Sequence, residues 1–199
     1  MALGSTMAPY ELRFDAGRIC LDLLATTHPD ERLDAPEPLR AWIVRSGLVP
    51  AATPLAHVDS SWLVGFRELR GQIGQLVRSG SRSSNDTRPY DLALARVNDL
   101  ARAATPAPRA VRDEEGALVR QLDGAPGCGA LLAVIARDVV ELLTDPVARA
   151  SLRECEGDNC PIVYLDSSRG RRRRWCSSEV CGNRERVARH RRRAALARA

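Results

Sequence analysis

Most of the first 150 residues follow the hydrophobic period of an α-helix. The strongest pattern runs over Gly129–Thr144, and a second begins at Asp59 or Ser60, either of which can cap a helix. Shorter helices are predicted over Leu39–Leu48 and over Pro89–Leu100, where a proline suits the first turn. The apolar positions of the helix at Asp59 or Ser60 lie three or four residues apart, at Leu63, Phe66, Leu69, Ile73 and Leu76. Those of the strongest helix lie on one side, at Leu131, Leu132, Ile135, Val139 and Leu142.

Two other segments alternate apolar and polar positions, which is typical of β-hairpins. The first would join Leu12–Phe14 to Ile19–Leu23, and its alternation places Asp22 on the solvent side. The second would join Ala107–Val111 to Ala117–Leu122. The sequence therefore predicts a mainly α domain with a small β-hairpin element, an α+β fold.

The charge separates this body from a C-terminal module. Residues 1–150 hold 17 Arg and 19 acidic residues (net −2), residues 151–199 hold 13 Arg and 6 acidic residues (net +7), and the whole chain carries +5. Every basic side chain is an arginine, whose guanidinium can donate two hydrogen bonds to a phosphate or a base edge. We therefore predict a helical domain over residues 7–148 and a basic, nucleic-acid-binding module over residues 151–199.

Four of the six cysteines lie in the basic module, as two pairs with one spacing. Four residues separate Cys155 from Cys160, and four separate Cys176 from Cys181, with fifteen residues between the pairs. Two such pairs suit one tetrahedral zinc ion, and Gly157 permits the tight turn that the first pair needs. Because four thiolates fill the coordination sphere, the predicted zinc is structural. Two disulfides are the alternative, which a reducing compartment disfavours.

The rest of the module is predicted to alternate between strand and helix. Ile162–Asp166 and Arg171–Trp175 would form a hairpin between the cysteine pairs. A helix from Ser178 to about Leu196, capped by Ser177 or Ser178, would follow the second pair. The order of knuckle, hairpin, knuckle and helix predicts a treble-clef-like or ribbon-like zinc module.

The arginines of the module are the candidate nucleic-acid contacts, because seven net charges repel one another unless phosphates neutralise them. Arg186, Arg189 and Arg193 share one helix face by their spacing. The full candidate set is Arg169, Arg171, Arg172, Arg173, Arg174, Arg184, Arg186, Arg189, Arg191, Arg192 and Arg193.

The body offers no candidate for catalysis. It contains no phosphate loop, dinucleotide fingerprint or glycine-flanked nucleophilic serine. His28 and His57 lack partners at ligand spacing, and Cys20 and Cys128 have no cation placed to activate them. No apolar run is long enough to span a bilayer. We expect a cytoplasmic protein with reduced thiols that is not an enzyme and has no membrane partner.

A short motif adds a family resemblance. Cys181-Gly182-Asn183-Arg184, between the basic runs Arg172–Arg174 and Arg191–Arg193, resembles the signature of the CGNR zinc fingers. Gly17–Leu23 is similar to the opening of the ABATE domain, which precedes such fingers and is described as a stress-induced transcription regulator. Ala25 stands where that family usually has Asn. The resemblance implies a DNA-binding zinc finger.

Three hypotheses about function follow. The favoured one is a bacterial-type transcription regulator whose zinc module binds DNA and whose helical domain senses a small-molecule effector or forms a homodimer. The second is an RNA-binding zinc protein, although RNA recognition relies on exposed aromatic side chains and the module has only Tyr164 and Trp175. The third is a small-molecule-binding or enzymatic body with a structural zinc tail.

Overall fold

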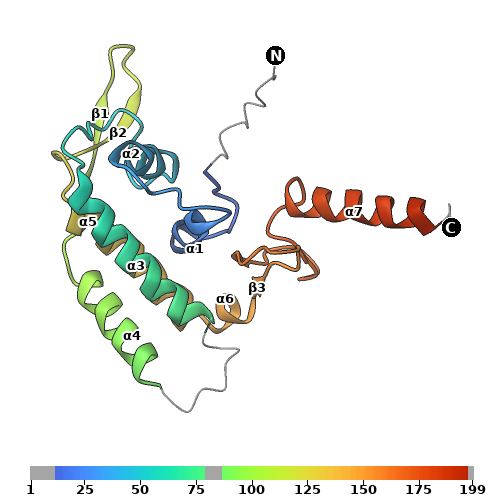
Figure 1. Cartoon of the computed structure of the whole chain (residues 1–199). Helices are drawn as coiled ribbons and strands as arrows, with labels where there is room; N and C mark the ends of the chain where they lie inside the picture. The colour runs from blue at the N-terminus through green and yellow to red at the C-terminus, as the bar shows by residue number, and fades with distance from the viewer. Residues whose placement is uncertain (1–11, 79–86, 197–199) are drawn as a thin grey trace, which may run out of the picture.

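The computed structural model describes residues 12–78 and 87–196 as a helical body from which a C-terminal module projects (Figure 1). The body contains α1 (Ile19–Leu24), the 3-10 helix η1 (Ala25–Thr27), α2 (Pro36–Arg45), α3 (Ser60–Arg78), α4 (Arg88–Ala101), the strands β1 (Pro108–Arg112) and β2 (Leu118–Leu122), α5 (Cys128–Thr144) and α6 (Pro146–Ala150). The module contains β3 (Leu152–Glu154), β4 (Val163–Leu165) and α7 (Cys181–Leu196). The mainly α fold with small β elements is confirmed.

The long predicted helices are confirmed because their apolar stripes meet in one core. α3 and α5 pack against each other and against α4, and the buried side chains of α3 and α5 include all the apolar positions that predicted these two helices. Asp145 ends α5 and caps α6, because its side chain accepts hydrogen bonds from the amides of Val147 and Ala148. The antiparallel hairpin of β1 and β2 is confirmed as well.

The predicted hairpin over Leu12–Leu23 is wrong. Residues Ile19–Leu24 form α1, which lies in the core against α3 and α5. Five consecutive residues, Cys20 to Leu24, are buried, so this helix is enclosed on all sides. A short enclosed helix cannot be told from a strand by its period, since both appear as a short apolar run. Asp138 accepts a hydrogen bond from the amide of Cys20 and so stabilises the first turn of α1.

Asp22, predicted to face solvent, is buried with only 9% of its surface exposed. Its Oδ1 accepts a hydrogen bond from the amide of Ala16 at 3.0 Å, which closes the turn before α1. Burial raises the pKa of this carboxyl to about 7, and the Ala16 hydrogen bond offsets only part of that effect.

No helix in the described parts of the chain is long and apolar enough to cross a membrane. The serine- and glycine-rich segment at 80–86 and the first eleven residues lie outside the described residues.

The burial of Asp22 predicts a pH-dependent stability. Because the folded chain holds this proton more tightly than the unfolded chain does, the stabilisation is complete below about pH 4 and is lost as the pH rises through about 7. Relative to the variant Asp22→Asn, we expect the free energy of unfolding of the wild-type protein to fall by about 2 kcal/mol between pH 5.5 and 8. Urea unfolding of both proteins across this range measures the difference, and parallel pH profiles would contradict it.

Candidate metal centre and nucleic-acid interface

The module folds around a different strand pair from the one predicted. β4 pairs with β3, which precedes the first cysteine, in the register Leu152 with Leu165 and Glu154 with Val163. The expected strand over Arg171–Trp175 is absent from the described structure, so the predicted hairpin between the cysteine pairs is wrong. β3 has only three residues, too few for its alternation to be recognised in the sequence.

Side chains hold the segment that was predicted as the second strand. Asp166 is buried, and its carboxylate accepts hydrogen bonds from the amides of Ser168 and Arg173. The hydroxyl of Tyr164 donates to the carbonyl of Arg173, and the amide of Glu156 donates to the carbonyl of Arg174. The segment is therefore fixed against the first cysteine turn without forming a ladder.

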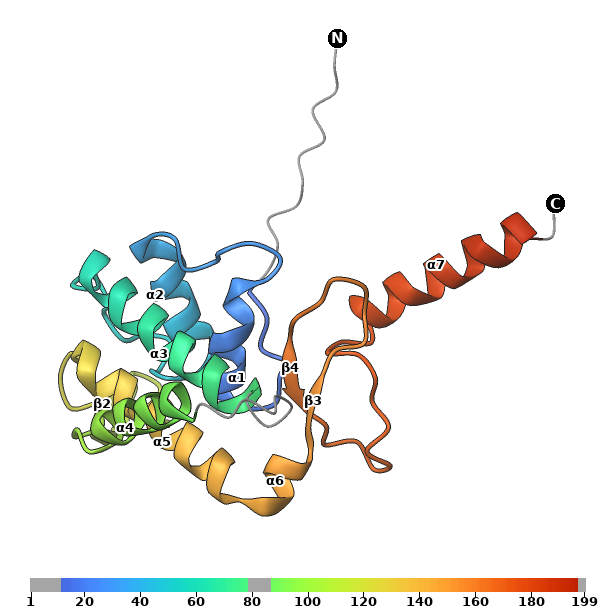
Figure 2. The ribbon, with the colours of Figure 1, turned by 60° about the horizontal axis from the view of Figure 1, so that its bottom comes forward.

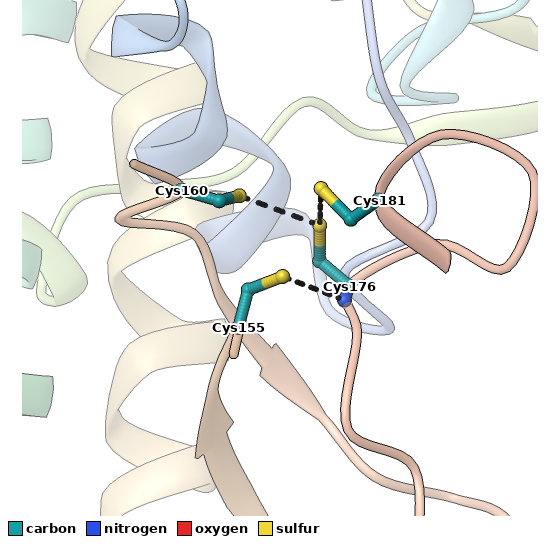
Figure 3. Close-up of side chains that lie close together, drawn as sticks. All are labelled: Cys155, Cys160, Cys176 and Cys181. Carbon is teal, nitrogen blue, oxygen red and sulfur yellow. Dashed lines mark hydrogen bonds between the residues drawn. The ribbon is translucent and has the colours of Figure 1, made fainter. Parts of the chain in front are cut away.

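The four cysteines of the module meet at one buried point (Figure 3). Their sulfur atoms all lie within 4.8 Å of one another. Cys176 Sγ is 3.7 Å from Cys160 Sγ and 3.6 Å from Cys181 Sγ. Zinc with Zn–S bonds of about 2.3 Å places its sulfur ligands about 3.8 Å apart, whereas a disulfide brings them to about 2.05 Å. The spacing fits four thiolates around one zinc ion, and no disulfide joins them.

Backbone amides and tight turns shape this centre. Cys155 Sγ accepts hydrogen bonds from the amides of Gly157 at 3.4 Å and Cys176 at 3.3 Å. A Cβ atom at Gly157 would lie 3.2 Å from the Cβ of Cys181, so a side chain here would crowd this zinc ligand. Asn159 has a φ of 55°, the left-handed conformation that asparagine tolerates.

The electrostatics of the centre also fit a cation. Hydrogen bonds from the neighbouring Cys160 thiol and from Arg13 lower the pKa of Cys176 to about 5, against the opposing effect of burial. The hydrogen bond to Cys176 and then burial raise the pKa of Cys160, and burial and the neighbouring Cys176 sulfur raise that of Cys181. Without a cation these surroundings keep Cys160 and Cys181 protonated, so all four cysteines ionise together only around a divalent cation, and they form the site of one structural zinc.

Arg13, which sequence analysis did not identify, contacts this centre. Its Nη1 donates to Cys176 Sγ at 3.3 Å across 163 residues of sequence, and its Nη2 donates to Asp15. No local spacing connects Arg13 with Cys176, so no sequence signal was available. A cation beside a thiolate ligand of zinc stabilises its ionised form and fixes its orientation.

The segment before α1 attaches the module to the body. The carbonyl of Ala16 accepts a hydrogen bond from the amide of Leu165 at 2.8 Å, which extends β4 toward the body. At Gly17, with a φ of 91°, a Cβ would lie 3.2 Å from the Cβ of Leu165. The guanidinium of Arg173 donates to the carbonyl of Asp15 at 3.3 Å. Residues 13–17 thus form a clamp between the zinc centre and the buried helix α1.

The last element, α7, begins at the zinc ligand Cys181 and projects away from the body (Figure 2). Ser177 caps the turn before it, because its hydroxyl accepts hydrogen bonds from the amides of Glu179 and Val180. Arg186 donates to the carbonyls of Gly182 and Ser178 and so braces the first turn. The predicted helix is confirmed, with its start three residues later than expected.

The structure divides the eleven candidate arginines into two groups. Arg173 donates to the carbonyls of Trp175 and Cys176 and covers the Tyr164 ring, while Arg174 pairs with Glu156 and lies over Trp175. Arg186 braces α7, and Arg192 lies 4.0 Å from Glu185. Within the described residues, the others are exposed and their side chains have no hydrogen-bond or ion-pair partner: Arg169, Arg171, Arg172, Arg184, Arg189, Arg191 and Arg193.

The isolated cysteines and one histidine of the body have environments that suit structural roles. Burial raises the pKa of Cys20 well above its usual value and that of Cys128 to about 11, so neither thiol is activated as a nucleophile. His57 hydrogen-bonds through Nε2 to the carbonyl of Pro126 and packs edge-on against Trp62.

Comparison with known proteins gives two family matches. The model of the ABATE family, described as "Putative stress-induced transcription regulator", matches residues 17–146. The model of the CGNR zinc finger matches residues 151–194, which contain all four cysteines of the centre. A search of curated proteins found no significant match.

The metal centre predicts a stoichiometry and a structural dependence. We expect one zinc ion per full-length chain, and we expect Cys176→Ser or a strong chelator to remove it and to unfold the module, since zinc binding supplies its folding energy. Metal analysis and far-ultraviolet circular dichroism measure the two effects. The matched variant Cys128→Ser should keep the zinc, and an ordered module without metal would contradict the assignment.

The contact of Arg13 with Cys176 makes a separate prediction. We expect Arg13→Ala to weaken zinc affinity about 10- to 100-fold, the usual effect of losing a partner of a metal ligand. Competition with a coloured chelator measures this affinity. The control is Arg45→Ala. Arg45, at the end of α2, lies over the ring of Phe14, the residue next to Arg13, and contacts none of the four sulfur atoms. Equal zinc affinity in the two variants would show that Arg13 does not support the centre.

Proposed function

Because the chain belongs to the ABATE family and contains a CGNR zinc finger, we propose that it is a zinc-dependent transcription regulator that binds double-stranded DNA through its C-terminal module. In this proposal it acts in the bacterial cytoplasm during stress. The family description indicates a regulator rather than an enzyme. The zinc has a structural part in this function, since its four protein ligands leave no position open for a substrate.

The observation that carries the proposal is the exposed, unpaired charge of α7 and of the loop before the second cysteine pair. α7 has 16 residues and is therefore about 24 Å long, and it projects clear of the body (Figure 2). An α-helix of this kind fits the major groove of B-DNA, which is about 12 Å wide. Arg169, Arg171 and Arg172 offer a second group of free guanidinium groups on a loop that Asp166 holds in place.

The clamp of residues 13–17 supports a regulatory role for the body. It leads directly into α1, the buried helix that packs against α3 and α5, and it contacts β4 and the zinc centre at its other side. In the proposed regulator, an effector or a second copy that binds the helical body would act on the zinc module through this connection.

Phosphate contacts predict a strong dependence on salt. If five to seven arginines neutralise phosphates, the logarithm of the binding constant for duplex DNA should fall against the logarithm of salt concentration with a slope of about −5 to −6. Replacing Arg169, Arg171 and Arg172 together by alanine should reduce the magnitude of the slope by about 2 to 3. Fluorescence anisotropy with a labelled duplex measures both slopes.

A control variant and an RNA competitor show whether the salt dependence comes from the module and from duplex DNA. Replacing the exposed body arginines Arg96, Arg102 and Arg120 by alanine removes the same charge and should leave the slope unchanged. Unlabelled RNA should compete less well than duplex DNA. Binding that does not respond to salt would contradict the proposal.

A further inference from the structure

The two sides of α7 differ in chemistry. Residues three or four apart share a face of a helix, so one side presents Asn183, Val187, His190, Arg191 and Ala194, which we call the mixed face. The opposite side presents Glu185, Arg186, Arg189, Arg192 and Arg193, with Leu196 at the end of the helix. A surface for phosphates needs only positive charge, whereas a surface for bases needs donors, acceptors and apolar groups together.

The mixed face is exposed and its polar side chains are unpaired, whereas the charged side is partly engaged within the module. Val187 is 42% exposed in the middle of a basic helix, where no described core residue covers it. Asn183, His190 and Arg191 are exposed, and none of their side chains has a partner among the described residues. On the charged side, Arg186 and Arg192 are engaged with Ser178, Gly182 and Glu185.

We propose that the mixed face of α7 reads base edges in the major groove, an inference that rests on the DNA-binding function proposed above. Val187 packs against the 5-methyl group of a thymine, since this is the apolar group that the major groove offers. Arg191 can donate two hydrogen bonds to a guanine, and the amide of Asn183 can both donate to and accept from an adenine. Arg184 lies beside the mixed face, toward a phosphate backbone.

Val187 is the sharpest position for a test. Alanine favours helix more than valine does, and the side chain is exposed, so Val187→Ala removes methyl groups without disturbing the fold. Arg189→Ala is the matched control, because Arg189 stands two residues away on the charged side of the same helix. The full-length, zinc-loaded protein is used throughout.

The experiment selects bound duplexes from a random-sequence DNA pool and then replaces single thymines of the selected site by deoxyuridine, which lacks the methyl group. For the wild-type protein, one such replacement should weaken binding about fourfold, the effect of losing one buried methyl group. Val187→Ala should bind both duplexes with equal affinity. Arg189→Ala should keep the difference between the two duplexes, because its side chain faces away from the base edges.

The other outcomes separate the two proposals. Binding of duplex DNA by the wild-type protein without sequence preference, or an unchanged thymine preference in Val187→Ala, would overturn the base-reading inference and leave the DNA-binding function standing. Failure of the wild-type protein to bind duplex DNA would overturn both. A change of oligomeric state in Val187→Ala with no change in sequence preference would assign the exposed valine to self-association and overturn the inference.

Discussion

The structure of the C-terminal module depends on one zinc ion, which holds four buried cysteine sulfur atoms together as thiolates. The sulfur atoms come from the end of β3, from the turn after it, from the segment before α7 and from the first residue of α7. The module has a small apolar cluster around Ile162, Val163 and Tyr164, which is little material for a core. The metal therefore supplies the cohesion that a larger domain obtains from apolar burial.

The arginines around this centre have two distinct uses. Arg13 and Arg173 face inward, where a sulfur atom and several backbone carbonyls accept their hydrogen bonds, and Arg173 also covers the ring of Tyr164. These backbone carbonyls lie outside the β-strands and so have no partner strand to bond with, and a guanidinium with five donors can bind several of them at once. Fewer arginines are therefore available to bind a polyanion than the composition indicates, and they lie on the loop at Arg169–Arg172 and on α7.

The features that the sequence predicted correctly are those set by local spacing. The cysteine pairs, the helices α3, α5 and α7, and the hairpin of β1 and β2 each depend on residues within one short segment. The errors lie where distant contacts decide. α1 was predicted as a strand because its burial on all sides comes from α3 and α5, and the buried position of Asp22 follows from the same packing.

The segment at Arg171–Trp175 and the role of Arg13 show the same limit. The segment could return beside Ile162–Asp166 as a strand, but the carboxylate of Asp166 and the hydroxyl of Tyr164 bind the backbone groups that a ladder would use. Arg13 reaches Cys176 only because residues 13–17 pass beside β4 in the folded chain. Neither contact leaves a period or a spacing in the sequence.

The start of α7 at Cys181 has a geometric consequence. Because a zinc ligand is also the first residue of the helix, the metal fixes the rotational phase of every side chain that follows it. One residue inserted after Cys181 would turn the rest of α7 by about 100° and shift it along its axis by about 1.5 Å. The zinc centre thus fixes the orientation of the first residue of α7, and the number of residues after Cys181 determines the direction in which each later side chain of this helix points.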